Sequence, residues 1–375
     1  MHLAEIAALR AIPAAGIQLA LTQRCPLSCA HCSTNSSMGG TQFPGGPFRR
    51  LVESFTRDDH PEVMLMSGGE PLLRAGLVAE LAGRARQAGT RSYVLSGMYF
   101  ARSGRGLPGP IRRALGSVDH LAASLDAHHE REVARAEVYR AVHAALDLVP
   151  AVSFQLTGVD DDDPYLAEAV ADIRREFADR VPVLVTHLQP TGRARALARP
   201  SAPVAGPAAA PVAGPTPGPT PGPAPGPAPC DFATWPLVGY DGTVYGCARQ
   251  SLLERHRPAH LVLGQAADGW PALRARREAR ALLRMVRAIG PELTQRRFGS
   301  GERAGGPCAT CMGLSEEPAT AARAQQYLAG AAGQAVERMA RALAEDRDPY
   351  RFVARWGSAR YSRLVALGSE DACAD

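Results

Sequence analysis

The sequence of 375 residues predicts an α/β fold: a partial (βα)6 TIM-like barrel followed by a small cysteine-rich domain and a C-terminal helix. Three observations predict it. Short apolar runs alternate with helical patterns over residues 16–190, a proline-rich tract fills 200–229, and most of the eight cysteines fall into spaced groups. The alternation indicates a parallel sheet with right-handed crossovers. Six units are too few for a closed eight-stranded barrel, so we expect an open one.

The barrel elements are predicted from hydrophobic periodicity. Six short apolar runs are the strand candidates: Ile17–Thr22, Val63–Met66, Ser92–Ser96, His120–Leu125, Val152–Leu156 and Val183–Leu188. The helical patterns between them are clearest over three segments: Leu73–Ala88, Glu130–Leu148 and Tyr165–Phe177. In such sheets ligands bind at the C-terminal ends of the strands, so we expect the functional side chains there.

The second half of the chain begins after a linker. Residues 200–229 contain twelve prolines, which predicts an extended, disordered linker without a core. Next, the dipeptide Asp241-Gly242 lies between two short strand candidates, Trp235–Tyr240 and Thr243–Cys247. This arrangement predicts a β-hairpin.

The remaining segments are predicted more coarsely. They are an amphipathic stretch over Trp270–Ile289, a glycine-rich loop that carries Cys308 and Cys311, helical sequence over 320–344 and a weakly specified tail. The expected division is 1–199 for the barrel, 200–229 for the linker, 230–315 for the cysteine-rich domain and 316–375 for the C-terminal helix and tail.

The first cysteine group lies directly after the first predicted strand. Cys25, Cys29 and Cys32 have the spacing CxxxCxxC. Iron–sulfur clusters are held by cysteine thiolates, and three thiolates leave one iron of a [4Fe-4S] cluster open to a small molecule. A structural zinc site is the alternative, but it needs a fourth ligand, and we expect His31 to be poorly placed beside Cys32.

The spacing resembles the signature of the radical S-adenosylmethionine (SAM) superfamily, and the resemblance extends in order over residues 15–195. Ser67-Gly68-Gly69-Glu70-Pro71, after the second strand, resembles the GGEP motif of that superfamily. His31 departs from the aromatic residue common before the third cysteine, although a planar ring is retained. The resemblance implies that SAM binds the open iron and is cleaved reductively to a 5′-deoxyadenosyl radical.

The resemblance also implies a set of SAM-binding residues. Paired glycines let the backbone approach a ligand closely, and the resemblance assigns their segment to the SAM amino group. Strand-end residues would contact the ribose and carboxylate, although such residues are as often helix caps or turn formers. The implied contacts are Gly68, Gly69, Glu70, Ser96, Ser124 and Asp126. His128 and His129 follow Asp126, and we expect at most one of them to face the cavity. The turn Pro190–Arg193, after the sixth strand, resembles a turn in several relatives but is equally consistent with a plain glycine turn.

A second cysteine group follows the linker. The group has the pattern CX11GX4C, followed after a gap by CxxC. This pattern resembles the start of the C-terminal extensions called SPASM and twitch. No cysteine occurs over 312–372, which favours the shorter twitch form. The resemblance implies one auxiliary [4Fe-4S] cluster, and a four-cysteine zinc ribbon is the alternative. The ligands would be Cys230, Cys247, Cys308 and Cys311, with Cys373 an incidental tail thiol.

The implied activity is that of a radical SAM oxidoreductase or maturase, with a flavodoxin- or ferredoxin-type electron donor. Relatives modify ribosomally made peptides or dehydrogenate small sugars and alcohols, and both substrates stay open here. No catalytic base is indicated. A non-catalytic iron–sulfur electron carrier would leave the GGEP motif unexplained, and the 6% aromatic content disfavours a nucleic-acid-binding zinc ribbon.

Charge and hydropathy add further expectations. All 42 basic residues are arginine, and the net charge of +5 does not indicate nucleic acid. Residues 249–303 hold twelve arginines and five acidic residues, which predicts either a solvated helix face or a docking surface for an acidic peptide leader. No apolar run is long enough to span a bilayer, and the N-terminus lacks the order of a signal peptide. We therefore expect a cytoplasmic protein without membrane contact.

Overall fold

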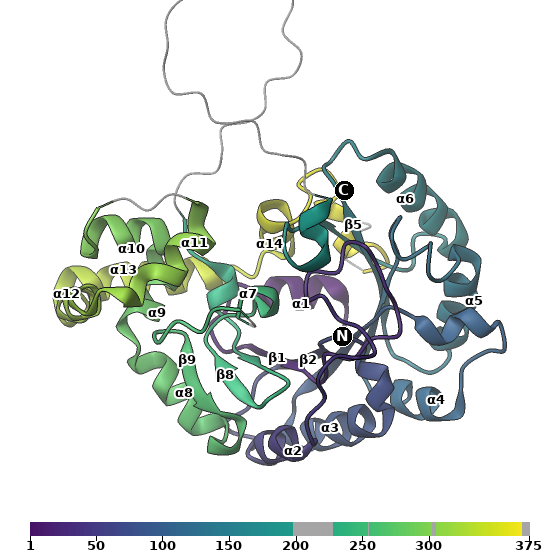
Figure 1. Cartoon of the computed structure of the whole chain (residues 1–375), viewed down its shortest axis with the longest axis horizontal. Coiled ribbons are helices and arrows are strands. Elements are labelled where there is room, and N and C mark those ends of the chain that lie inside the picture. Colours follow the sequence, from purple (N-terminus) through teal and green to yellow (C-terminus); the bar gives the residue numbers. More distant parts are fainter. Residues whose placement is uncertain (198–227, 254, 302–304, 370–375) are drawn as a thin grey trace, which may run out of the picture.

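The computed structural model describes residues 1–197, 228–253, 255–301 and 305–369. Its core is a curved sheet whose first six strands are parallel, so the predicted partial (βα)6 barrel is confirmed (Figure 1). These strands are β1 (Gly16–Ala20), β2 (Val63–Ser67), β3 (Arg91–Ser96), β4 (His120–Ser124), β5 (Val152–Gly158) and β6 (Val183–His187). The full strand order is β6-β5-β4-β3-β2-β1-β7-β8-β9, and within the described residues the two edge strands do not pair with each other. The barrel is therefore open.

Helices cover the outer face of the sheet, as right-handed crossovers require. Figure 1 shows five of them along the outer rim: α2 (Gly46–Glu53), α3 (Ala75–Ala88), α4 (Gly109–Leu115), α5 (Arg135–Leu146) and α6 (Pro164–Phe177). The helix predicted from Glu130 begins only at Arg135, because the Asp126 carboxylate accepts the backbone N–H groups of His128 and His129 and holds that segment in a turn.

The inner face is closed at one end and open at the other. Helix α1 (Leu3–Leu9) packs Ile6 and Leu9 against Val63 and Leu65, near the N-terminal ends of the strands. Trp235 completes this plug and donates a hydrogen bond from Nε1 to the Leu9 carbonyl at 3.0 Å. The N-terminal end of the barrel is therefore filled, and space remains at the C-terminal ends.

The second half of the chain extends the same sheet. Strand β7 (Leu237–Val238) pairs in parallel with β1, and β8 (Thr243–Tyr245) pairs antiparallel with β7, so the predicted hairpin is confirmed. Gly242 adopts a φ of 85° in its turn, a conformation that glycine reaches without strain. Strand β9 (Val262–Gln265), which the sequence did not indicate, adds an outer antiparallel strand.

The later helices differ from prediction in three places. The stretch Trp270–Ile289 is two helices, α8 (Trp270–Ala279) and α9 (Ala281–Ile289), because Arg280 is extended and N-caps α9. The helical sequence over 320–344 is also divided, at Gly330, into α12 (Pro318–Ala329) and α13 (Ala331–Glu345). The loop predicted around Cys308 and Cys311 is wrong: both lie on helix α11 (Gly306–Gly313), which starts after the left-handed Gly305 with a proline in its first turn.

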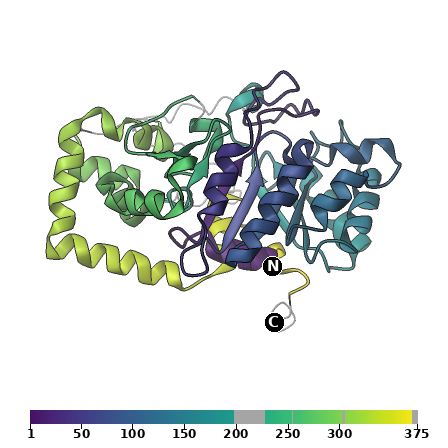
Figure 2. The ribbon, with the colours of Figure 1, turned by 90° about the horizontal axis from the view of Figure 1, so that it is seen from below.

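The other elements complete the small region. Helix α10 (Pro291–Phe298) lies on the side of the molecule away from α4–α6, whereas α7 (Gln250–Leu253) lies near the middle. Helix α14 (Pro349–Trp356) packs on α1 and β6. Figure 2 shows α12 and α13 as an outer wall on that far side. The predicted linker, over 200–227, and Cys373 lie outside the described residues. None of the helices in the described ranges is both long and apolar enough to cross a bilayer.

Candidate functional site

A cavity of about 390 Å³ lies at the C-terminal ends of the strands. One wall is the loop after β1 with its three cysteines, and the floor is formed by the ends of β2–β6. The opposite wall is residues 248–251, directly after Cys247, together with Phe232 and Trp356. The cavity therefore lies between the first cysteine group and the segment that follows a cysteine of the second group.

The cysteine loop is held in place by the turn after β6. Arg193 donates from Nε to the Cys29 carbonyl at 2.9 Å and from Nη1 to the Ser36 carbonyl at 2.7 Å, and its own backbone N–H donates to the Cys32 carbonyl. A Cβ on Gly192 would lie 2.3 Å from that same Cys32 oxygen, so only glycine permits the approach. The turn Pro190–Arg193 is therefore a clamp on the cysteine loop rather than a plain glycine turn.

The thiols of the loop have unequal acidity. Burial raises the pKa of Cys25 to about 12, and the negative charges of Glu70, Cys29 and Cys32 add to that shift. Burial also opposes ionisation of Cys32, but hydrogen bonds from Thr34 and the Ser36 backbone, with the nearby charge of Arg193, lower its pKa overall. Three thiols that repel one another when ionised, around one cavity, suit a cationic iron–sulfur cluster, which offsets that repulsion.

The Gly68-Gly69 pair packs against the cysteine loop. A Cβ on Gly68 would lie 2.5 Å from the Thr22 carbonyl oxygen, and one on Gly69 would lie 2.3 Å from the Arg24 carbonyl oxygen. The Gly69 and Glu70 N–H groups donate to those two oxygens at 2.6 and 2.8 Å. The two glycines thus let the end of β2 pack closely against the backbone of residues 22–24, rather than only against a ligand. This contact fixes the end of β2 beside the loop that leads to Cys25.

The carboxylate of Glu70 is fully buried and already has donors. It accepts hydrogen bonds from the backbone N–H of Leu72 and of Gly97, each at 2.9 Å, and from the Ser96 hydroxyl at 3.0 and 3.1 Å. Burial raises the pKa of Glu70 to about 7 against the effect of these donors. Ser96 does not line the cavity, so the structure does not bring the hydroxyl predicted to contact SAM to that space.

The end of β4 brings together groups that the sequence separates. Ser124 and Asp126 both line the cavity. The Asp126 side chain is only 1% exposed and binds two histidine rings through Oδ2: His129 Nδ1 at 2.7 Å and His31 Nε2 at 3.3 Å. Burial alone would raise the pKa of Asp126, but the two histidines hold it well below its usual range; in turn Asp126, with a contribution from Cys29, raises the pKa of His129 to about 10. His129, not His128, lines the cavity.

His31 belongs to a possible ligand set that differs from the three cysteines. Cys29, His31 and His129 each offer one ligand atom, and these atoms lie within 4.8 Å of one another. His31 reaches this group because the loop folds back so that its ring packs against the rings of His128 and His129 after β4. Cys25 and Cys32 are not part of the group, so it is not the three-cysteine zinc site for which His31 is expected to be poorly placed. No spacing rule shows this group, since Cys29 and His129 are a hundred residues apart.

The four cysteines of the second group influence one another electrostatically. The negative charges of Cys230, Cys247 and Cys308 add to the effect of burial, which raises the pKa of Cys311 well above its usual value. Burial likewise raises the pKa of Cys230 to about 11 and of Cys247 to about 12. Cys308 and Cys311 are one turn apart on α11, so they share a face. Such a gathering of free thiols fits an iron–sulfur cluster or a zinc ion.

Arg249 in the cavity wall was not identified from the sequence. Its guanidinium lies 3.9 Å from the centre of the Phe232 ring, and its Nη1 donates to Gln189 Oε1 at 2.7 Å. Its place two residues after Cys247 was the available signal, because a residue beside a ligand of one site can reach the neighbouring cavity.

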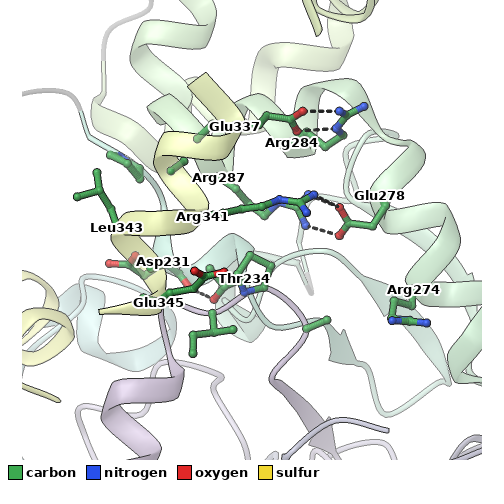
Figure 3. Close-up of a pocket in the computed structure, with 18 of the residues that line it drawn as sticks. Asp231, Thr234, Arg274, Glu278, Arg284, Arg287, Glu337, Arg341, Leu343 and Glu345 are labelled. Carbon is green, nitrogen blue, oxygen red and sulfur yellow. Dashed lines mark hydrogen bonds and ion pairs between the residues drawn. The ribbon is translucent and has the colours of Figure 1, made fainter. Parts of the chain in front are cut away.

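A second cavity, of about 550 Å³, lies between α8, α9 and α13 (Figure 3). Glu278 accepts hydrogen bonds from Arg277 and Arg287, and Arg284 binds Glu337 through two hydrogen bonds. Both carboxylates are already bound to arginines, and none of the lining residues is a cysteine or histidine, so the cavity at the strand ends is the candidate site.

Comparison with solved structures gives matches of low similarity, all at 12–13% identity. No protein-family model matches the chain. The solved structure of anSMEcpe with bound AdoMet gives a TM-score of 0.48 at 12% identity, over 83% of this chain and 99% of that chain. BtrN in complex with AdoMet and 2-DOIA gives 0.42 at 12% identity, over 73% and 87%. SuiB of Streptococcus suis, bound to its precursor peptide SuiA, gives 0.38 at 12% identity, over 50% and 43%.

One curated protein is similar in sequence. Pre-heme d1 synthase of Dinoroseobacter shibae is 46% identical over 80 residues, and the match spans 20% of this chain and 19% of that protein. Three cysteines on the loop after the first strand face one cavity with the Gly-Gly-Glu strand end. This geometry brings together the two motifs on which the resemblance to the radical SAM superfamily rests.

Proposed function

We propose that this chain is a radical SAM enzyme that oxidises its substrate with the help of an auxiliary cluster. The observation that carries the proposal is the joint lining of one cavity by Cys25, Cys29 and Cys32 and by Gly68–Glu70. Cys25, Cys29 and Cys32 would hold a [4Fe-4S] cluster, which when bound would supply one electron for cleavage of SAM to methionine and a 5′-deoxyadenosyl radical.

The protein positions the reactants. Arg193 and the Gly68-Gly69 contact fix the cysteine loop from two sides, and Glu70 joins the ends of β2 and β3 through its donors. Ser124 and the backbone at Gly68–Glu70 remain as the groups that contact SAM in the cavity. Glu70, Ser96 and Asp126 act on SAM indirectly, because their side chains are already bound to protein groups.

The second thiol group is proposed to hold the auxiliary [4Fe-4S] cluster. Cys247 is followed directly by the cavity wall at 248–251, so a cluster there would lie beside the bound substrate. That position suits an acceptor for the electron left on a substrate radical, which favours net oxidation.

The test is anaerobic reconstitution with iron and sulfide, followed by dithionite and SAM. Two clusters correspond to about eight irons per chain. Cys25→Ala should lose about half of the iron and all 5′-deoxyadenosine formation. Cys308→Ala should lose a similar amount of iron and still release 5′-deoxyadenosine. Zinc in place of iron, or no SAM cleavage by the fully loaded chain, would overturn the proposal.

The proposed substrate is a ribosomally made peptide, and a small sugar or alcohol is the second candidate. The basic segment 249–303 supports the peptide as a docking surface for an acidic leader. One observation favours the small metabolite: six arginines of that segment already bind carboxylates of this chain. They are Arg257, Arg274, Arg276, Arg277, Arg284 and Arg287. Retention of the chain on an immobilised acidic leader peptide, at physiological salt, would support the peptide, and no retention would favour the metabolite.

A further inference from the structure

Cys29, His31 and His129 form a compact cluster of soft and borderline ligands in the wall of the cavity. Their ligand atoms lie within 4.8 Å of one another. Cys29 is 6% exposed, and the two histidine side chains are 12% and 13% exposed. The residues come from two loops, after β1 and after β4, so the fold itself creates the group.

Asp126 orients both histidines. One oxygen, Oδ2, lies 2.7 Å from His129 Nδ1 and 3.3 Å from His31 Nε2, while Oδ1 accepts the backbone N–H groups of His128 and His129. Each ring therefore uses one nitrogen for the carboxylate. The other nitrogen of His31, Nδ1, is buried and without a hydrogen-bond partner among the described residues. In metal sites a carboxylate typically binds the second nitrogen of a ligating histidine and fixes its ring in this way.

We propose that the iron-free chain binds one Zn²⁺ ion through Cys29, His31 and His129, with Asp126 orienting the two rings. Cysteine thiolate and histidine imidazole are both ordinary zinc ligands, and three protein ligands leave the fourth position open to water. Zinc bonds of about 2.0–2.3 Å in tetrahedral geometry place ligand atoms roughly 3.5 Å apart, so the side chains close by about 1 Å on binding. Binding releases two protons to solvent, one from the Cys29 thiol and one from the His129 ring, which Asp126 otherwise keeps protonated.

The site has a consequence for the proposed enzyme, and this part rests on the proposed function. Cys29 cannot bind zinc and a [4Fe-4S] cluster in the same geometry, because the two require it to face different metal centres. Zinc and the cluster therefore exclude each other, and zinc bound first blocks assembly of the cluster at the cysteine loop.

The first experiment uses the full-length iron-free chain and cobalt(II) under anaerobic conditions. Cobalt bound to a thiolate and imidazoles gives charge-transfer and tetrahedral absorption bands, and zinc displaces it. His31→Asn and His129→Ala should each bind one ion fewer per chain than the wild type, whatever the second cysteine group binds. Asp126→Asn should weaken this site by about 10- to 100-fold, as for other residues that orient metal ligands.

Matched variants distinguish this site from an ion held by the three cysteines alone. His128→Ala, one position from His129, should bind as the wild type does, since His128 is not one of the three ligands. Cys25→Ala and Cys32→Ala should also retain the ion. If they lose it and the histidine variants keep it, the ion is bound by the three cysteines, and the proposal is wrong. Circular dichroism of each variant separates loss of the ligand from loss of the fold.

The second experiment separates this inference from the proposed function. Two equivalents of zinc, enough to fill the second cysteine group as well, added before iron and sulfide should lower iron uptake at the first cysteine group of the wild type but not of His129→Ala. If the cobalt site is present and no chain assembles a cluster, the proposed function fails while the zinc site stands. If clusters assemble and the cobalt site is absent, the zinc site alone fails.

Discussion

Gly69→Ala tests whether the contact between the end of β2 and the cysteine loop is essential. Gly69 has an ordinary φ, so the added methyl group introduces no backbone strain and acts only by contact. Its carbon would lie 2.3 Å from the Arg24 oxygen and 2.9 Å from the Gln23 carbonyl carbon. Both atoms belong to the backbone, so neither can move aside as a flexible side chain would. The strand end and the loop must separate.

The cost follows from two contributions. Overpacking of a close contact costs about 1–3 kcal/mol. Separation also weakens the bonds from the Gly69 and Glu70 N–H groups to the Thr22 and Arg24 oxygens, each of which contributes about 1 kcal/mol. We expect the free energy of unfolding to fall by about 2–4 kcal/mol in total. At a urea slope of about 3 kcal/mol/M, the unfolding midpoint falls by about 1 M.

The assay is urea unfolding of the iron-free chain, followed by tryptophan fluorescence, and then iron uptake on reconstitution. Gly76→Ala is the control, since its added carbon meets nothing within 4 Å in the exposed part of α3. Alanine there should raise stability by about 0.5–1 kcal/mol. If Gly69→Ala unfolds at the wild-type urea concentration and takes up iron normally, the close contact does not hold the cysteine loop, and the reasoning fails.

Three further predictions rest on other contacts. Arg193→Met should reduce iron uptake at the first cysteine group only, because it removes the hydrogen bonds to the Cys29 and Ser36 carbonyls. The control is Arg195→Met, since Arg195 is exposed. Equal iron content in the two variants would contradict the role of Arg193 as a clamp. Glu278→Gln should lower the free energy of unfolding by about 1–3 kcal/mol, because it leaves the buried Arg277 without its carboxylate; the value should lie toward the low end, since Glu278 is itself 39% exposed. Glu337→Gln should cost less, because its partner Arg284 (Figure 3) is 22% exposed and Arg277 only 1%; the reverse order would refute the assignment. Burial lowers the pKa of His120 to about 4, so between pH 6.5 and 4 this histidine is protonated in the unfolded chain and neutral in the folded chain. The free energy of unfolding should therefore fall by up to about 3 kcal/mol as the pH drops from 6.5 to 4. If a His120→Gln chain keeps the same dependence of stability on pH in chemical unfolding, another group is responsible.

The barrel could be predicted because its signals are local. Each strand is an apolar run of about five residues, and each outer helix has one apolar face. The periodicity of the apolar residues and the order of the segments were therefore sufficient to predict the barrel. The break between α8 and α9 was not predictable in this way. Arg280 is a good helix former, and the interruption arises where its side chain donates to the Val262 carbonyl of β9.

The sequence predicted the cysteines and the Gly-Gly-Glu segment of the candidate site, but not the residues that hold them in place. The cysteine spacing and the Gly-Gly-Glu motif are contiguous in sequence, so they could be read directly. Arg193 reaches the Cys29 carbonyl across 164 positions, and His129 reaches Cys29 across a hundred, which no periodicity records. Glu70 illustrates the limit: the motif is visible, but only the fold shows that its carboxylate is occupied by Leu72, Ser96 and Gly97.

The pairing of β7 with β1 decides where this chain can be divided. Gln18 and Leu19 bind β2 on one side and Leu237 and Val238 on the other, and Trp235 sits under the same strand. A fragment that ends at residue 199 would therefore expose a bare strand edge in what was the middle of the sheet, together with an unfilled hole beneath it. Unprotected edges of this kind recruit other chains. Attempts to express the barrel alone should give aggregates, and a soluble truncation must keep the hairpin.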